Sequence, residues 1–219
     1  MQWACDGVPC ECEFGQRASL RAFGGGGGGV AVRAALRSHR TDAFTPEPKD
    51  QELPAVYVAG EYDRLVTYDG PAPWTGAGPR ELPTPQPQPP WRPGRFNATE
   101  GWAAFVNSTG WGLCVVASAA GLRGGGFEGP GSKRAGDGAG GDEPGPLEWL
   151  GGFTERPGAG RSSVDPTTGY LAPVRRAALG PDAAFGYDFA LVLGTVAEIR
   201  AAAAELQGRG GVYFSGSTP

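Results

Sequence analysis

The chain has 219 residues, a length that fits one all-β domain, and its formal net charge is −4. It has no basic stripe, which argues against a nucleic-acid partner, and no apolar run long enough to span a bilayer. The 39 glycines and 21 prolines are concentrated in a few stretches between strongly apolar segments. The composition therefore predicts an ordered core interrupted by long insertions.

The first predicted strands are residues 17–23 and 30–37. In the second, Val30, Val32 and Ala34 fall on one face, which is the period-two pattern of a half-buried strand. The six consecutive glycines at 24–29 predict a flexible hairpin connection that packs no core.

A polar, proline-bearing loop is expected up to Leu53, followed by strands at 55–59 and 62–68, which are rich in Val and Tyr. The proline-rich stretch 79–94 predicts an exposed extended insertion.

The clearest hairpin joins residues 102–106 and 111–117, because Asn107-Ser108-Thr109-Gly110 supplies the turn chemistry between them. Residues 121–146, with eleven glycines, predict a disordered insertion. Further strands are expected at 147–153, 170–174 and 185–193.

One helix is predicted near the C-terminal end of the chain. Thr195 and Glu198 have the spacing of a capping box, and Gly208 is placed to end the helix. Many strands followed by one helix indicate an all-β class: an antiparallel sandwich, occupying residues 1–219 as a single domain.

The cysteines and sequons bear on compartment. Cys5, Cys10 and Cys12 lie within eight residues, but a four-ligand zinc site would need Cys114 or His39 from far away, so no metal is expected. A disulfide from this cluster is favoured in a secreted protein, and Cys114 is expected to be a buried thiol. The sequons at Asn97 and Asn107 favour an extracellular or secretory location, although no signal peptide is present.

Several phrases of this sequence resemble uncharacterised, mostly bacterial secreted proteins with a galactose-mutarotase-like supersandwich core. They are ECEF at 11–14, SHRTD at 38–42, QELPAVY at 51–57, TYDGP at 67–71, ATEGWAAFV at 98–106, GWGL at 110–113, GYLAP at 169–173 and LGTVAEIR at 193–200. The resemblance implies a carbohydrate-associated protein. It also implies longer relatives with more strands upstream, so that this chain would hold only part of the supersandwich.

Sugar chemistry usually requires an acid and a base beside an aromatic platform. The expected catalytic residues are Glu52 and Glu100, with His39 as a helper. Each also has a structural interpretation: Glu52 as a partner of Arg40 or a backbone cap, Glu100 as a solvated strand end, and His39 as a loop hydrogen-bonding residue.

The expected sugar-binding residues are Trp74, Trp91 and Tyr57, whereas Trp102 and Trp111 flank a tight hairpin and are expected in the core. No phosphate-cradling loop or nucleophile elbow is present, and no cofactor is expected.

Three functional hypotheses follow. The leading one is a carbohydrate-binding or carbohydrate-active protein that performs hydrolysis, elimination or epimerisation if it is an enzyme. The second is a non-catalytic glycan-binding or wall-associated module, and the third is an incomplete fragment without independent activity, which would expose an open sheet edge. The sequence does not determine the sugar, the reaction or the oligomeric state.

Overall fold

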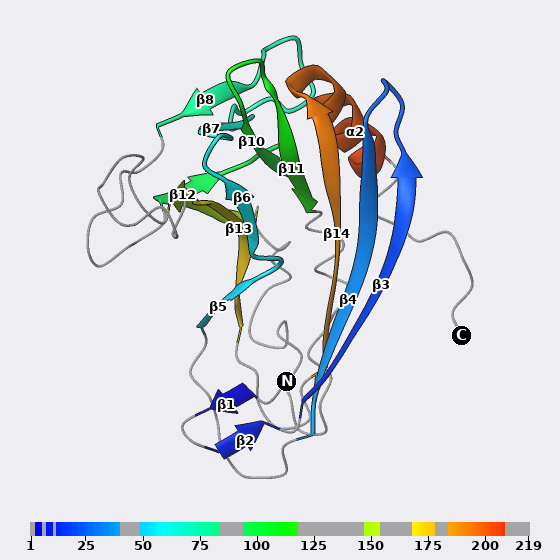
Figure 1. Cartoon of the computed structure of the whole chain (residues 1–219), viewed down its shortest axis with the longest axis vertical. Coiled ribbons are helices and arrows are strands. Elements are labelled where there is room, and N and C mark those ends of the chain that lie inside the picture. Colours follow the sequence, from blue (N-terminus) through cyan, green and yellow to red (C-terminus); the bar gives the residue numbers. More distant parts are fainter. Residues whose placement is uncertain are drawn as a thin grey trace.

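The computed structural model describes residues 3–5, 8–10, 12–39, 49–83, 94–117, 147–153, 168–177 and 184–208. The predicted insertion 121–146, most of the proline-rich stretch and the candidate Trp91 lie outside these residues. The described part is mostly β, with antiparallel pairing throughout and one helix at its C-terminal end, as predicted (Figure 1).

The larger sheet has seven strands in the order β3-β4-β14-β11-β10-β7-β8. Their bounds are β3 (Cys12–Ala22), β4 (Gly28–Ser38), β7 (Arg64–Thr67), β8 (Arg80–Leu82), β10 (Trp102–Val106), β11 (Trp111–Ala117) and β14 (Ala184–Thr195). The β10–β11 hairpin has the predicted bounds, and Asn107 Oδ1 closes its turn by accepting hydrogen bonds from the backbone N–H groups of Thr109 and Trp111.

The smaller sheet has the order β5-β13-β12-β9. Its strands are β5 (Lys49–Glu52), β9 (Gly94–Asn97), β12 (Glu148–Phe153) and β13 (Thr168–Ala177), and β6 (Val56–Ala59) also pairs with β13. A separate pair, β1 (Trp3–Cys5) and β2 (Val8–Cys10), completes the strands. β5 corrects the prediction of a loop up to Leu53: Lys-Asp-Gln-Glu has little intrinsic strand preference, and its pairing with β13 supplies the hydrogen bonds.

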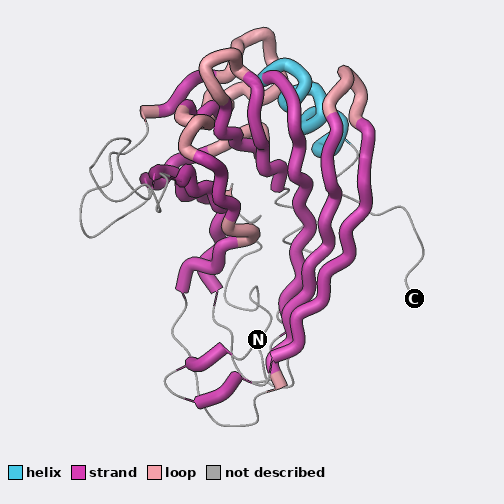
Figure 2. Tube along the Cα trace, in the orientation of Figure 1, coloured by secondary structure: helices cyan, strands magenta, loops and turns pink. Residues whose placement is uncertain are grey.

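The two sheets pack face to face over β7, β10 and β11. Leu65, Phe105 and Val115 from the larger sheet contact Trp149 and Phe153 from β12 in one buried cluster. The long strands β3, β4 and β14 extend beyond the smaller sheet (Figure 2), so the sandwich closes over only part of this face.

Helix α2 (Val196–Gly208) covers the opposite face of the larger sheet. Its buried residues Ile199, Ala202 and Leu206 pack with Trp102, which is fully buried as predicted. The predicted capping box is present: Glu198 accepts hydrogen bonds from the Thr195 backbone N–H at 2.7 Å and from its hydroxyl at 2.8 Å. These bonds fix where the helix begins.

The glycine run differs from the predicted flexible connection. Gly28 and Gly29 belong to β4, and Gly25 and Gly26 have positive φ in a short turn closed by the Phe23 N–H and the Gly27 carbonyl. Gly24 donates its N–H to Glu205 of α2 at 2.8 Å. The turn therefore packs against the helix.

The cysteines also fit the sequence expectations in part. Cys114 is fully buried with a free thiol, and burial raises its pKa. Cys12 is disulfide-bonded. Among the described residues, no helix is long and apolar enough to cross a bilayer.

Candidate functional site

The candidate site is built on the loop that follows β7, residues 68–79. Three hydrogen bonds hold this loop: Tyr68 and Thr75 donate their hydroxyls to the Ala72 carbonyl at 2.7 and 2.8 Å, and Thr99 donates to the Gly70 carbonyl at 2.7 Å. The loop is therefore held by its own side chains and by the segment that enters β10.

Glu100 lies beneath the loop and is buried. Its carboxylate accepts hydrogen bonds from the Trp74 backbone N–H at 2.8 Å and the Trp102 indole N–H at 2.9 Å. Arg200 of α2 donates to both carboxylate oxygens, from Nε at 3.0 Å and from Nη2 at 2.5 Å. A buried carboxylate is tolerated when it is paired and hydrogen-bonded in this way.

The protonation of Glu100 follows from these contacts. Desolvation by burial raises its pKa, but the hydrogen bonds from Arg200, Trp102 and Trp74 outweigh this effect, so the pKa lies below its usual range. Glu100 is therefore an ionised structural carboxylate, whereas a general acid at neutral pH needs a raised pKa.

Trp74 is held in an unusual backbone conformation, with a φ of 62°. This left-handed region is unfavourable for a bulky residue, and the hydrogen bond from its N–H to Glu100 helps to keep it there. Its side chain remains 40% exposed. The structure thus combines a fixed backbone with an accessible indole ring.

A hollow of about 530 Å³ lies between Trp74 and helix α2. We call it the Trp74 hollow; its lining residues are Trp74, Thr75, Pro79, Val196, Ala197, Arg200, Ala201 and Ala204. Arg200 is the one charged residue among these described lining residues, and its guanidinium lies 5.2 Å from the Tyr68 ring centroid. Among the described residues, Arg200 Nη1 has no hydrogen-bond partner, so this group is available as a donor.

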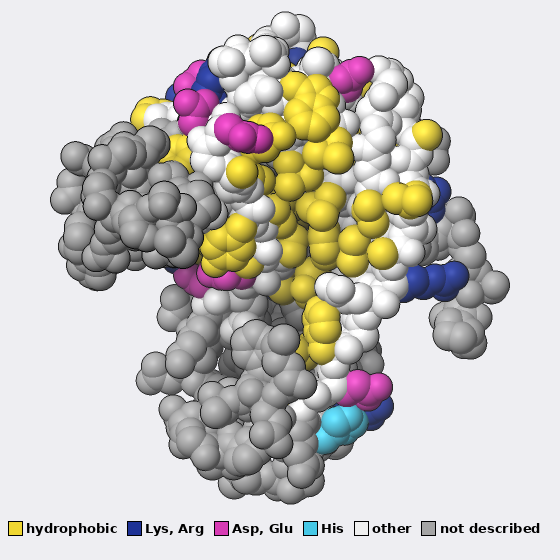
Figure 3. Space-filling view, viewed as in Figure 1, with side chains coloured by type: hydrophobic (Ala, Val, Ile, Leu, Met, Phe, Trp, Pro, Cys, Tyr) yellow, Lys and Arg dark blue, Asp and Glu magenta, His cyan; other side chains and the backbone are white. Residues whose placement is uncertain are grey.

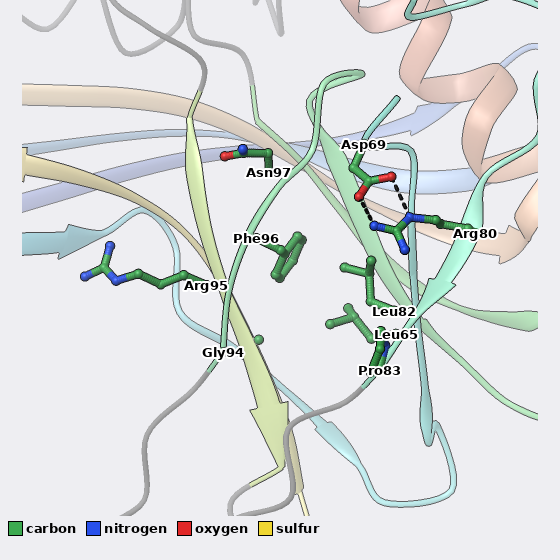
Figure 4. A pocket seen from close by; sticks show the side chains of 10 residues that line it. Leu65, Asp69, Arg80, Leu82, Pro83, Gly94, Arg95, Phe96 and Asn97 are labelled. Carbon is green, nitrogen blue, oxygen red and sulfur yellow. Dashed lines mark hydrogen bonds and ion pairs between the residues drawn. The ribbon is translucent and has the colours of Figure 1, made fainter. Parts of the chain in front are cut away.

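A second cavity, of about 330 Å³, lies where β8 and β9 approach each other at the edges of the two sheets (Figure 4). Asp69 and Arg80 form an ion pair on one side, and Phe96 points into the space from β9. Phe96 also stacks on Trp149 at a centroid distance of 6.2 Å. None of the described residues predicted for sugar binding or catalysis lines this cavity.

The three predicted catalytic residues have different neighbours. Glu52, at the end of β5, lies by Tyr170, whose pKa is raised first by burial and then by this carboxylate. His39 follows β4 and lies 3.5 Å from the Glu13 carboxylate, with both side chains exposed. Glu100 binds Arg200. The described cavities place none of the three together.

Two aromatic residues that do not line the Trp74 hollow are exposed. Tyr57 is 59% exposed and packs on Tyr170, and Trp111 is 39% exposed and packs on Tyr62. The expectation that Trp111 fills the core is wrong, because it occupies the first position of β11, opposite Thr195 at the last position of β14. Of the predicted site residues that the structure describes, Trp74 and Glu100 are in contact, and Glu52 and Tyr57 both lie against Tyr170.

Sequence reasoning missed Arg200. It is the only basic residue of α2 and stands among alanines, and a single arginine in such a helix is a signal for a buried partner. The described residues contain no group of three or more His, Cys, Asp or Glu side chains arranged to hold a metal ion. Neither a protein-family model nor a curated protein matches this sequence.

Proposed function

We propose that the protein is a carbohydrate-binding β-sandwich module and that the Trp74 hollow is its sugar site. The observation that carries this proposal is the exposed Trp74 ring on a fixed backbone, at the wall of a hollow that contains one available charged donor. A sugar ring has an apolar C–H face and a rim of hydroxyls. The indole offers a surface for the first, and Arg200 Nη1 offers a donor for the second.

The preorganisation of the hollow also supports this proposal. The Trp74 backbone is held by Glu100, and Arg200 is fixed by the same carboxylate and by its bond to the Thr75 carbonyl at 3.2 Å. Groups that are already ordered lose little conformational entropy when a ligand binds. The floor is formed by small residues of α2, Ala197, Ala201 and Ala204, which leave room for a flat ring.

Binding is better supported than catalysis. Glycosidases generally use two carboxyl groups about 5 to 9.5 Å apart. No carboxylate of the described residues lines the Trp74 hollow, and the nearby Glu100 is ionised and already accepts four hydrogen bonds. Turnover by Glu52, Glu100 and His39 would require them to share a substrate, whereas each has a different set of neighbours.

The test is binding of the purified chain to a glycan array, followed by titration with the best ligand. Trp74→Ala should weaken binding by about tenfold or more, since one stacking contact of about 1.4 kcal/mol corresponds to that factor. Trp111→Ala is the matched control, because its indole is equally exposed but lies on another surface.

Circular dichroism checks that both variants are folded. A folded wild-type chain that binds no glycan contradicts the carbohydrate proposal. Binding that survives Trp74→Ala and is lost in Trp111→Ala places the site on the Tyr62–Trp111 surface instead and contradicts the proposed hollow.

A further inference from the structure

The edges of the two sheets differ in length and protection. β8 has three residues and is followed by Pro83, while β5, β6 and β9 have four residues each. β3 has eleven residues, and among the described strands none pairs with its outer side (Figure 1). β3 contains no proline or lysine and pairs with β4 without a bulge. Within the described residues, β3 is therefore not protected by shortness, proline or a bulge.

No residue of β3 is buried, and its two faces differ in chemistry. Phe14 and Leu20 project to the same face as Leu36 and Val30 of β4, their register partners. Leu20 is 87% exposed and Phe14 is 51% exposed. The other face carries Glu13, Arg17 and Arg21.

These apolar residues continue a larger apolar surface. Figure 3 shows hydrophobic side chains gathered in a band over β6, β11, β14 and β4. The exposed or only partly buried apolar residues of these strands and of the segment between β6 and β7 include Tyr57, Tyr62, Trp111, Leu113, Leu191, Leu193 and Val30. A long open edge beside such a band is a surface for strand pairing.

The sequence of β3 is complementary to itself in the antiparallel direction. When two copies are aligned about a twofold axis at Arg17, Phe14 lies opposite Leu20 of the second copy, and Glu13 lies opposite Arg21. Because of the twofold symmetry, each of these contacts occurs twice in the dimer, as in any isologous interface. One unfavourable contact, Arg17 with its own copy, lies on the axis.

We propose that the protein forms a twofold dimer in which the β3 strands of two copies pair antiparallel, joining both seven-stranded sheets into one continuous sheet. Backbone groups on the outer side of β3, which no described strand pairs, supply the hydrogen bonds. The two Phe14–Leu20 contacts supply apolar burial and favour this register. This interface is independent of the Trp74 hollow.

Cysteine cross-linking tests the register directly. In the proposed dimer the two Arg17 Cα atoms are about 4.5 to 5.5 Å apart, a separation that a disulfide spans. The two Leu20 Cα atoms are separated by six residues along the strands, or about 20 Å. Under mild oxidation, Arg17→Cys should give a covalent dimer on non-reducing gels well above the wild-type background, and Leu20→Cys should not.

The association itself is measured by analytical ultracentrifugation of the full chain over a range of concentrations. Leu20→Lys should raise the dissociation constant of the dimer about tenfold or more, since it puts a charge at an apolar contact. Leu193→Lys is the control, because this exposed residue lies on β14, away from the edge.

The wild-type chain remaining monomeric at its highest soluble concentration overturns the proposal. Equal cross-linking at positions 17 and 20 overturns the register. A dimer that is weakened by Leu193→Lys and unaffected by Leu20→Lys shows packing through the apolar band instead of edge pairing, and it likewise overturns the proposal.

Discussion

Helix α2 closes one face of the seven-stranded sheet, whereas the smaller sheet leaves part of the other face open. On the helix side, the strand surface beyond α2 carries charged side chains, such as Arg33 paired with Asp188. On the other side, the surface beyond the smaller sheet carries Leu20 and Leu193, which are exposed. The helix side thus carries charged side chains beyond its covering element, whereas the other side exposes apolar ones.

The largest expected effect on stability comes from a substitution on the helix side of the larger sheet. Glu100→Ala should reduce the free energy of unfolding by about 3–5 kcal/mol, because it leaves Arg200 without its carboxylate and two N–H groups without an acceptor. Urea denaturation measures the change. Glu61→Ala removes an exposed carboxylate and is the control, and an equal effect of the two variants would contradict a structural role for Glu100.

A smaller effect on the free energy of unfolding is expected at two neighbouring positions of β14, whose side chains lie on opposite faces of the sheet. Val192 is fully buried beneath α2, whereas Leu193 is 46% exposed on the open face. Val192→Ala should cost about 2 kcal/mol of unfolding free energy, from lost burial and a cavity.

Leu193→Ala should cost only a few tenths of a kcal/mol in dilute monomer, although it removes the larger side chain. The same denaturation series measures both variants. A large loss for Leu193→Ala would mean that the band is packed within one copy.

The smallest expected effect concerns pH. The folded-state pKa of Glu100 is lowered, so its ion pair stabilises the fold above the ordinary pKa near 4.5, and this contribution is lost as the pH falls through the folded pKa. Glu100→Gln should therefore lose less stability than the wild type on acidification below about pH 4.5. Parallel slopes of unfolding free energy against pH for the two proteins would contradict this assignment.

Local sequence features predicted the local parts of the fold. The β10–β11 hairpin has the predicted bounds because its turn residues and apolar arms are contiguous, and the capping box of Thr195 and Glu198 fixes the start of α2. β5 was not predictable, since its polar residues become a strand only by pairing with β13.

Like β5, the candidate site is formed by residues that lie far apart in the sequence. The sequence indicates Glu100 because it precedes Trp102, and Trp74 because it lies in a loop. The arrangement that joins them also involves Arg200, which is 100 residues from Glu100 in the sequence. The tight hairpin predicts a core position for Trp111, but this residue is exposed at the first position of β11.

The glycine turn has a consequence for how the chain tolerates genetic change. Six identical letters conceal positions with different constraints: a Cβ at Gly28 meets nothing, one at Gly29 would lie 2.2 Å from the Leu191 carbonyl oxygen, and Gly25 and Gly26 require positive φ. Substitution of glycine by a residue with a Cβ should therefore be tolerated at Gly28 and should destabilise the fold at Gly29. A tract that looks like a uniform repeat therefore differs in steric tolerance from one position to the next.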